Sequence, residues 1–341
     1  MEKDMIMVSI HCLAYNHEKY IRKTLEGFVS QKTNFCYEIL VHDDASTDGT
    51  QDIIREYEQK YPDIVKPIYQ KENQYSKGVK ILRAYNFPRV KGKYLAFCEG
   101  DDYWCDEHKL QKQVDILEKH PECSLCTHFA ERISENGKKM NGTIPATALG
   151  EGVIEKEAYL KYELLNGWAS QTSSFLVPIK YLDEYFKERP KYSEKMLVGD
   201  FPLVLYLLTK GKVYFCRESM SCYRVDSVGS YKERRKKDTL LSLRHIYTLV
   251  DGIAEYNKYT GYQYDKIIKA YIVNRLEDVK EIEKKILKEY DACYFETVYQ
   301  GRMRHIRYFV RRKLPHIYKF LLWGLKMFNK LKAGKGLRND K

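Results

Sequence analysis

Short apolar runs alternate with amphipathic segments over roughly the first 120 residues, and this alternation constrains the fold more than any other feature. The apolar runs, each short enough for a buried strand, lie at 5–16, 37–46, 65–70 and 93–104. Between them, residues 17–31 and 46–61 carry apolar side chains at helical spacing. Strands that alternate with helices predict a mostly parallel sheet with helices on both faces.

Polar clusters follow three of these predicted strands. They are Tyr15-Asn16, Asp43-Asp44 and Glu99-Gly100-Asp101-Asp102. In such sheets, ligands bind beyond the carboxyl ends of the strands, where neighbouring strand ends share one edge. The sequence therefore predicts that the three clusters converge on one rim of the sheet.

The cluster at 99–102 places three carboxylates at one strand end. Such groups repel one another unless a cation lies between them. Mg²⁺ and Mn²⁺ are usually held by one or two carboxylates and by phosphate oxygens of a substrate, so the cluster predicts a phosphorylated ligand. An acidic turn that caps the helix predicted at 107–119 is the alternative, and these residues alone favour neither interpretation.

The second cluster precedes a turn with its own capping residues. Asp48-Gly49 favours a turn, and Ser46 or Asp48 is a good helix cap, so the cap does not need the acid pair before it. Asp43 and Asp44 are therefore candidates to accept hydrogen bonds from a nucleotide base and ribose. Tyr15 is a candidate flat face for the base.

Beyond residue 120 the predicted elements no longer alternate regularly. A hairpin is predicted from 124–133 and its partner after Asn136-Gly137, a strand at 172–178, a helix at 200–210, and a hairpin or strand pair at 212–225. Residues 236–300 are predicted to be helical. Asp200 opens an apolar helix and is, on sequence alone, either a helix cap or a functional acid.

The positive charge is concentrated at the C-terminal end. The chain has a formal net charge of +12, and residues 301–341, with 13 basic residues and one acidic residue, account for all of it. This distribution argues against nucleic acid as a partner. It predicts that residues 302–335, where basic and aromatic side chains interleave, form an amphipathic helix on an anionic membrane surface. A solvated helix that packs on the domain is the alternative.

The sequence shows no signal for export from the cytosol. It has no run of about 18 apolar residues and no signal-peptide pattern at its start. Its nine cysteines lie at irregular spacing, which favours reduced thiols over a disulfide framework. We expect a cytoplasmic protein, peripheral at the inner face of the plasma membrane.

Three motifs resemble those of the family 2 glycosyltransferases, which have the nucleotide-diphospho-sugar transferase (GT-A) fold. The family pattern has a strand ending in Thr-Tyr-Asn, an Asp-Asp-Gly-Ser-Thr-Asp-Gly-Thr turn and an Asp-x-Asp-Asp metal motif. The sequence contains VSIHCLAYN, VHDDASTDGT and CEGDDYW in that order. Residues 72–78 and 92–114 resemble a subgroup of bacterial polysaccharide enzymes, and the resemblance as a whole covers about residues 6–235.

The resemblance implies roles for the matching residues on the donor side. The nucleotide base and ribose would be surrounded by Ala14, Tyr15, Asp43 and Asp44. The main metal ligand would be Asp101. Glu99 would reach ribose or metal, and Asp102 would assist. Two positions depart from the pattern, since Ala14 replaces the usual Thr and Ala45 the usual Gly. Neither departure removes a charge, so we expect the site to retain nucleotide binding.

The resemblance also implies a catalytic base and an anion contact later in the chain. Asp200 would be the base, with Gly199 in place of the family's Glu. Arg224 would contact the diphosphate, although Asp226 replaces the His of the family's Tyr-Arg-x-His element. Specificity in the family lies in the variable half, here 140–200, and the residues concerned would include Trp168, Gln171 and Tyr192.

The implied protein has a Rossmann-like GT-A domain at 1–235, a helical extension at 236–300 and the basic segment at 301–341. The implied activity is inverting sugar transfer that depends on Mg²⁺ or Mn²⁺, from a nucleotide-diphospho-sugar, a UDP-sugar first, to a glycan or lipid-linked acceptor. Two other classes stay open. A sugar-phosphate nucleotidyltransferase shares the fold, but residues 13–18 do not form its Gly-rich basic loop. A non-catalytic membrane-surface binding protein is the other.

Overall fold

The computed structural model describes residues 5–147, 149–227 and 229–289. The chain divides into two compact units after Leu276, and the fold described here is that of the first unit. The basic segment predicted at 301–341 lies outside the described residues, as does the end of the helical extension predicted at 236–300. None of the helices within the described ranges has the length and apolar character that crossing a bilayer requires.

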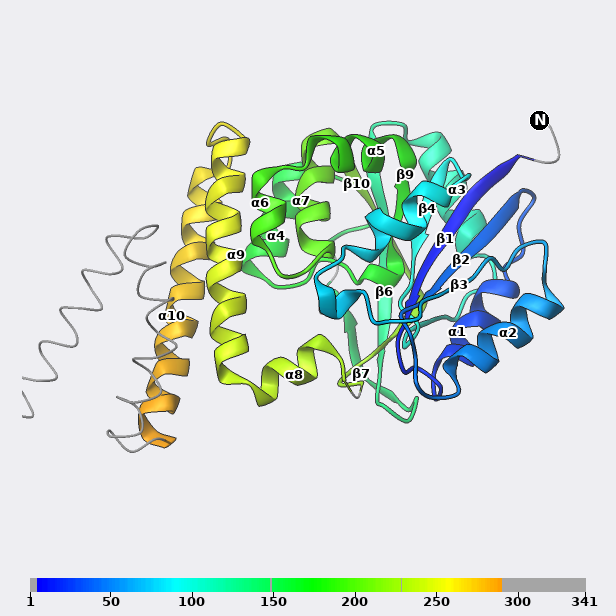
Figure 1. The fold of residues 1–341 in the computed structure, drawn as a ribbon. Helices are drawn as coiled ribbons and strands as arrows, with labels where there is room; N and C mark the ends of the chain where they lie inside the picture. Colours follow the sequence, from blue (N-terminus) through cyan, green and yellow to red (C-terminus); the bar gives the residue numbers. More distant parts are fainter. Residues whose placement is uncertain (1–4, 148, 228, 290–341) are drawn as a thin grey trace, which may run out of the picture. The chain divides into compact units, whose positions relative to one another are not determined.

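Ten strands form one sheet in the described residues (Figure 1). They are β1 (Ile6–Ala14), β2 (Cys36–Asp43), β3 (Ile68–Tyr69), β4 (Tyr94–Phe97), β5 (Tyr103–Trp104), β6 (Cys123–Ile133), β7 (Lys139–Ile144), β8 (Gly152–Ile154), β9 (Leu176–Pro178) and β10 (Lys212–Arg224). The order is β3-β2-β1-β4-β9-β6-β10-β5, with β7 beside β6 and β8 beside β10. The first four strands are parallel, which confirms the fold class expected for the N-terminal part, and β9 runs antiparallel to both of its neighbours.

Helices lie in the predicted helical segments 17–31, 46–61 and 200–210, and others, such as those at Ile179–Glu188 and Lys191–Lys195, were not predicted. The helices are α1 (Ile21–Val29), α2 (Thr50–Lys60), α3 (Lys109–Lys119), α4 (Lys156–Leu165), α5 (Ile179–Glu188), α6 (Lys191–Lys195), α7 (Asp200–Lys210), α8 (Tyr231–Lys237), α9 (Thr239–Tyr259) and α10 (Asp265–Glu289). Short helical turns are η1 (Tyr75–Lys77), η2 (Leu82–Asn86), η3 (Phe87–Arg89) and η4 (Thr172–Ser174).

Side chains of β4 show why helices cover both faces of the sheet. Successive residues of a strand point to opposite faces. Leu95 and Phe97 belong to a core that α4, α5 and α7 complete, whereas Tyr94 and Ala96 belong to a core completed by α1, α2 and α3. Because both faces are covered, the ends of the central strands are the part of the sheet left open to a ligand.

One expectation for the second half of the domain was wrong. Residues 212–225, predicted as a hairpin or strand pair, form the single strand β10, which pairs in parallel with β6 over its length. The register shifts between Cys216 and Ser219 and again between Ser219 and Ser221, so bulges rather than a turn interrupt the apolar pattern. By contrast, the hairpin predicted around Asn136-Gly137 is present as β6 and β7.

A lysine is buried where α3 packs against the sheet. Lys109 is fully buried, its Nζ donates a hydrogen bond of 2.7 Å to Gln113 Oε1, and the ammonium lies 4.0 Å from the centroid of the Trp104 ring. Burial lowers its pKa from the ordinary 10.5 to about 7. In the unfolded chain the same amine keeps its proton to much higher pH.

We therefore expect the stability of the wild type, compared with that of Lys109→Met, to rise between pH 7 and about pH 10. Over that range the unfolded chain binds a proton that the folded chain has released, so the difference in free energy of unfolding has a slope of up to ~1.4 kcal/mol per pH unit. Urea unfolding of both proteins across the range measures this slope. A difference that stays flat would show that Lys109 remains charged in the fold.

Candidate active site

The ends of β1, β2 and β4 lie side by side, as the sequence predicted. The Asp44 N–H donates to Ala14 O at 2.9 Å, and the Gly100 N–H donates to Leu13 O at 2.9 Å. These bonds continue the ladder of the sheet past its last regular pairs. They bring the polar residues that follow the three strands to one rim.

Residues 99–102, here called the acidic loop, are fixed to α1. Thr24 Oγ1 donates to the carbonyl oxygens of Gly100 at 3.0 Å and Asp102 at 2.6 Å. A Cβ on Gly100 would lie 2.7 Å from His17 Nδ1, so a residue with a side chain does not fit there without a shift. The close packing sets the direction in which the neighbouring carboxylates leave the backbone.

Asp102 is turned into the protein. Its Oδ1 accepts the Arg224 N–H at 2.8 Å, its Oδ2 accepts Gln171 Nε2 at 3.4 Å, and the side chain is buried. Burial, and then the charge of Asp101, raise its pKa well above the ordinary range. Asp102 therefore ties the acidic loop to the end of β10.

Asp101 is only partly buried, and its Oδ1 accepts no hydrogen bond from the described residues. Its Oδ2 accepts a hydrogen bond of 2.6 Å from Ser227 Oγ. Sequence reasoning missed Ser227, although it directly follows the element, ending at Asp226, that the resemblance had singled out. This hydroxyl fixes the rotamer of Asp101.

The acidic loop concentrates negative charge. Burial raises the pKa of Glu99 to about 8, with further contributions from Asp101 and then Asp200. A cation beside Asp101 would relieve this repulsion. Within the described ranges no three acidic, His or Cys side chains are grouped as a ready-made metal cage. The residues thus fit a hard divalent ion held by one or two carboxylates and completed by oxygens of a ligand.

Asp43 and Asp44 are at the rim but bond to their own chain. Asp43 accepts hydrogen bonds from Ser46 N–H at 3.0 Å, Ser46 Oγ at 2.5 Å and Gln51 Nε2 at 2.6 Å. Asp44 accepts the N–H groups of Gln74 at 2.8 Å and Tyr75 at 3.0 Å. Both side chains are buried, so they order the two loops beside the rim, and their contact with a nucleotide stays a prediction.

Ala14 and Tyr15 differ in exposure. Ala14 is fully buried, while the side chain of Tyr15 is 43% exposed and leaves its ring open to a ligand.

Ala45, the other departure from the family pattern, has φ +64°, in the left-handed region that favours glycine.

We expect Ala45→Gly to stabilise the protein by about 1 kcal/mol, because it removes the contact between Cβ and the following carbonyl that makes this conformation costly. The greater freedom of glycine in the unfolded chain offsets part of the gain. Urea unfolding measures the change. As a matched control, Ala14→Gly in the extended strand β1 should lower stability, and a loss in both variants would refute the argument from backbone strain.

Asp200 is the first residue of α7 and is exposed. The N-cap is Gly199, which has no side chain, so the carboxylate of Asp200 is the group that accepts a first-turn backbone N–H at this helix end, and both the capping and the functional role stay open. Asp200 Oδ1 accepts the Phe201 N–H at 2.8 Å and Oδ2 accepts Thr172 Oγ1 at 3.3 Å. Its charge acts on Glu99, which places it within electrostatic reach of the acidic loop.

Arg224 holds the acidic loop from the opposite side. Its Nε donates to Asp101 O at 2.9 Å, and its Nη1 donates to Glu135 O at 2.5 Å and Ser134 O at 3.1 Å. The guanidinium carbon lies 4.4 Å from the centroid of the Tyr20 ring. With these contacts Arg224 positions Asp101, and its role as an anion contact stays a prediction.

Residues expected to govern specificity have different surroundings. Trp168 is 48% exposed, and its ring meets Tyr223 edge to face at 6.1 Å between centroids. Gln171 contacts Asp102. Tyr192 is buried in the core and packs against Tyr256 at 5.2 Å between centroids, so its side chain is not presented to a ligand.

The structure resembles solved sugar transferases in fold. A mannosyltransferase from Pyrobaculum calidifontis, solved in complex with GDP-Man and Mn²⁺, matches with a TM-score of 0.55 and 14% identity, over 98% of this chain and 88% of that one. At this identity the likeness shows the GT-A type of fold, with a curled central sheet flanked by helices.

Sequence comparisons give closer relatives. An uncharacterized protein of Mycobacterium tuberculosis is 34% identical over 237 residues, which are 67% of this chain and 63% of that protein. The chain thus spans less than two thirds of that relative's length. The Escherichia coli enzyme WfaP, a UDP-Glc:alpha-D-GlcNAc-diphosphoundecaprenol beta-1,3-glucosyltransferase, is 37% identical over 114 residues, which are 33% of this chain and 42% of the enzyme.

The model of the family described as Glycosyl transferase family 2 matches residues 9–181, about half of the chain. This range contains most of β1, all of β2 and β4, and the acidic loop, so it includes most of the rim. The chain belongs to glycosyl transferase family 2.

Proposed function

We propose that the chain is an inverting glycosyltransferase that moves a sugar from a nucleotide-diphospho-sugar to a hydroxyl group of a glycan or lipid-linked acceptor in cell-surface polysaccharide synthesis. One observation carries the proposal. The rim places an acidic loop with a partly open Asp101 within electrostatic reach of an exposed Asp200. This pairing would provide a site for a charged leaving group and an acid suited to activate a hydroxyl.

Asp101 is the proposed ligand of a Mg²⁺ or Mn²⁺ ion that the donor diphosphate completes. When bound, such an ion stabilises the negative charge that develops on the departing nucleoside diphosphate. Glu99 would reach ribose or metal, and Asp102 would assist. Tyr15 and the loops ordered by Asp43 and Asp44 would receive the nucleotide. UDP-sugars are the first candidate donors, because the name of the relative from Escherichia coli includes UDP-Glc.

Asp200 is the proposed catalytic base. Its carboxylate would accept the proton of the acceptor hydroxyl while that oxygen attacks the anomeric carbon from the face opposite the leaving group. A single displacement of this kind inverts the anomeric centre. Thr172, which donates to Asp200 Oδ2, would hold the carboxylate in place.

The basic segment is proposed to hold the enzyme at the inner face of the plasma membrane. It lies outside the described residues, so the proposal rests on its charge and aromatic content. We expect the full chain to bind liposomes that contain anionic lipid, and to bind them less as salt increases. Equal binding to neutral liposomes, or binding that salt does not change, would contradict an electrostatic anchor.

A donor panel tests the proposed function. The full chain is mixed with UDP- and GDP-sugars, with Mg²⁺, Mn²⁺ or EDTA, and both the melting temperature and the release of nucleoside diphosphate are measured. We expect one class of donor to raise the melting temperature and to be slowly hydrolysed only with a divalent ion present. No response to any donor in either metal would count against the proposal.

A further inference from the structure

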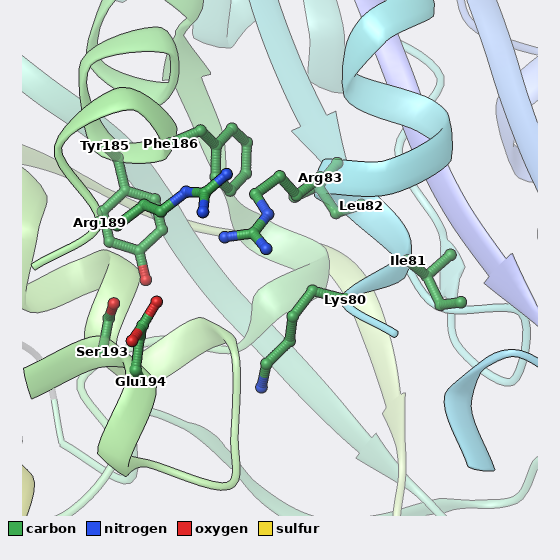
Figure 2. A pocket seen from close by; sticks show the side chains of 9 residues that line it. All are labelled: Lys80, Ile81, Leu82, Arg83, Tyr185, Phe186, Arg189, Ser193 and Glu194. Carbon is green, nitrogen blue, oxygen red and sulfur yellow. The ribbon is translucent and has the colours of Figure 1, made fainter. Parts of the chain in front are cut away.

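A second site lies outside the rim, in a cavity of about 330 Å³ between the start of η2 and the C-terminal end of α5. Three cationic side chains line it, those of Lys80, Arg83 and Arg189, against one acid, Glu194. Figure 2 shows Arg83 and Arg189 extending toward one another from opposite walls, with the ring of Phe186 behind them. The size lies at the lower end of the range for ligand pockets.

The three cations of this basic pocket, Lys80, Arg83 and Arg189, have no acidic partner within ion-pair distance among the described residues. Nearby lysines on the same surface are paired, as Lys77 with Glu72 and Lys187 with Asp183. Guanidinium groups that face one another repel, and an anion between them removes the repulsion. The fork of an arginine fits the oxygens of a phosphate group, which it binds through two parallel hydrogen bonds.

The backbone conformation of Arg189 is unusual for an arginine. Arg189 follows the last turn of α5 with φ +46°, and its N–H donates to Tyr185 O at 3.0 Å. Helices commonly end with a residue in this left-handed conformation, and that residue is usually glycine because a Cβ makes the conformation costly. The chain instead has an arginine there, and its side chain enters the pocket (Figure 2).

One wall of the pocket comes from the segment that precedes the proposed base in the chain. This wall includes Ser193 and Glu194 of α6, the helix that precedes Asp200 and α7. Burial raises the pKa of Tyr185, on the same wall, to about 12. Ser193 and the charge of Arg83 oppose this rise, and the charge of Asp200 adds to it. Asp200 is thus within electrostatic reach of the pocket.

We propose that the basic pocket binds a phosphate or diphosphate group carried by the acceptor, as in a sugar linked to a lipid through a diphosphate. The inference rests on the proposed function, because it uses the position of Asp200 as the base. An acceptor anchored by its phosphate groups at Arg83 and Arg189 would present its sugar hydroxyl toward Asp200. The apolar part of the pocket, with Tyr185 and Phe186, would exclude water from these charge-assisted bonds.

Inorganic pyrophosphate is the probe, and Arg189→Gly is the decisive variant. Pyrophosphate is titrated calorimetrically into the full chain in EDTA at constant ionic strength, so that no metal bridges it to Asp101. We expect Arg189→Gly to bind at least ~10-fold more weakly than the wild type, because it loses a bidentate charged contact. Without pyrophosphate its melting temperature should be no lower, because glycine suits the backbone at this position.

Two further variants make the result specific. Arg83→Gln removes the facing guanidinium and should also weaken pyrophosphate binding. Arg217→Gln removes one positive charge from an exposed position on β10 and should leave the affinity unchanged. Equal affinities of the wild type and Arg189→Gly would overturn the site. An equal loss in Arg217→Gln would also overturn it, because net charge alone would then explain the binding.

A second titration separates the acceptor from the donor as the source of the anion. UDP and GDP are titrated with Mg²⁺ into the wild type and Arg189→Gly, and we expect equal affinities. A parallel loss in the variant would overturn the assignment to the acceptor, because the pocket would then hold the donor diphosphate.

The two titrations together also distinguish failure of the pocket from failure of the proposed function. If no nucleotide binds at all while pyrophosphate binding still depends on Arg189, the anion site stands and the proposed function fails. If nucleotide binds but pyrophosphate does not depend on Arg189, only the pocket is refuted.

Discussion

Asp200→Asn should lower the rate of sugar transfer by ~10²-fold or more while the affinity for the donor changes little. A general base contributes in the transition state and scarcely in the ground state, so its loss reduces kcat without weakening donor binding. The replacement keeps the size of the side chain. It also keeps an oxygen that can accept the N–H of Phe201, and its amide NH2 group can donate to Thr172 Oγ1, so the start of α7 should stay folded.

Glu157→Gln is the matched control for this variant. Glu157 is also an exposed acid in the first turn of a helix, here α4, and its replacement should leave kcat unchanged. Wild-type turnover in Asp200→Asn would show that another group accepts the proton. It would also remove the observation on which the proposed displacement depends.

The sequence predicted the position of the rim because that position follows from local patterns. Buried strands that alternate with helices impose parallel pairing, and parallel pairing brings the carboxyl ends of neighbouring strands together. Ala14, Asp43 and Glu99 each follow or close such a strand, so their proximity needed no knowledge of side-chain packing. The same logic explains why the first four strands were predicted well and the bulged strand β10 was not.

These local patterns do not predict contacts between segments that are distant in sequence. Ser227 reaches Asp101 across 126 positions of sequence, and Arg83 and Arg189 line one cavity although more than a hundred residues separate them. Asp44 also accepts two backbone N–H groups of the loop at 72–78, and the sequence did not predict these contacts. Such contacts depend on how loops fold over the rim, which hydrophobic periodicity does not encode.

Asp101→Asn should abolish the metal-dependent rise in melting temperature and lower turnover by ~10³-fold. The amide has lost the negative charge that binds a divalent ion, and without the ion the charge on the departing diphosphate is no longer stabilised. Asparagine can still accept the Ser227 hydroxyl, so the acidic loop should keep its conformation. Thermal shift with UDP or GDP in Mg²⁺ and in EDTA measures the first effect, and donor hydrolysis measures the second.

Asp115→Asn is the control for this variant, because it neutralises an exposed acid on α3 away from the rim. It should respond to metal and nucleotide as the wild type does. If Asp101→Asn is stabilised by nucleotide and Mg²⁺ as much as the wild type is, the ion is held elsewhere and the assignment of Asp101 is wrong.

The configuration of the transferred sugar tests the central claim most directly. The full chain is incubated with the donor that the panel identifies and with an acceptor sugar linked to a lipid through a diphosphate, and the anomeric proton of the product is followed by NMR from the first turnovers. We expect the new linkage to have the anomeric configuration opposite to that of the donor, and to form only with Mg²⁺ or Mn²⁺ present. A product that retains the donor's configuration would contradict a single displacement assisted by Asp200.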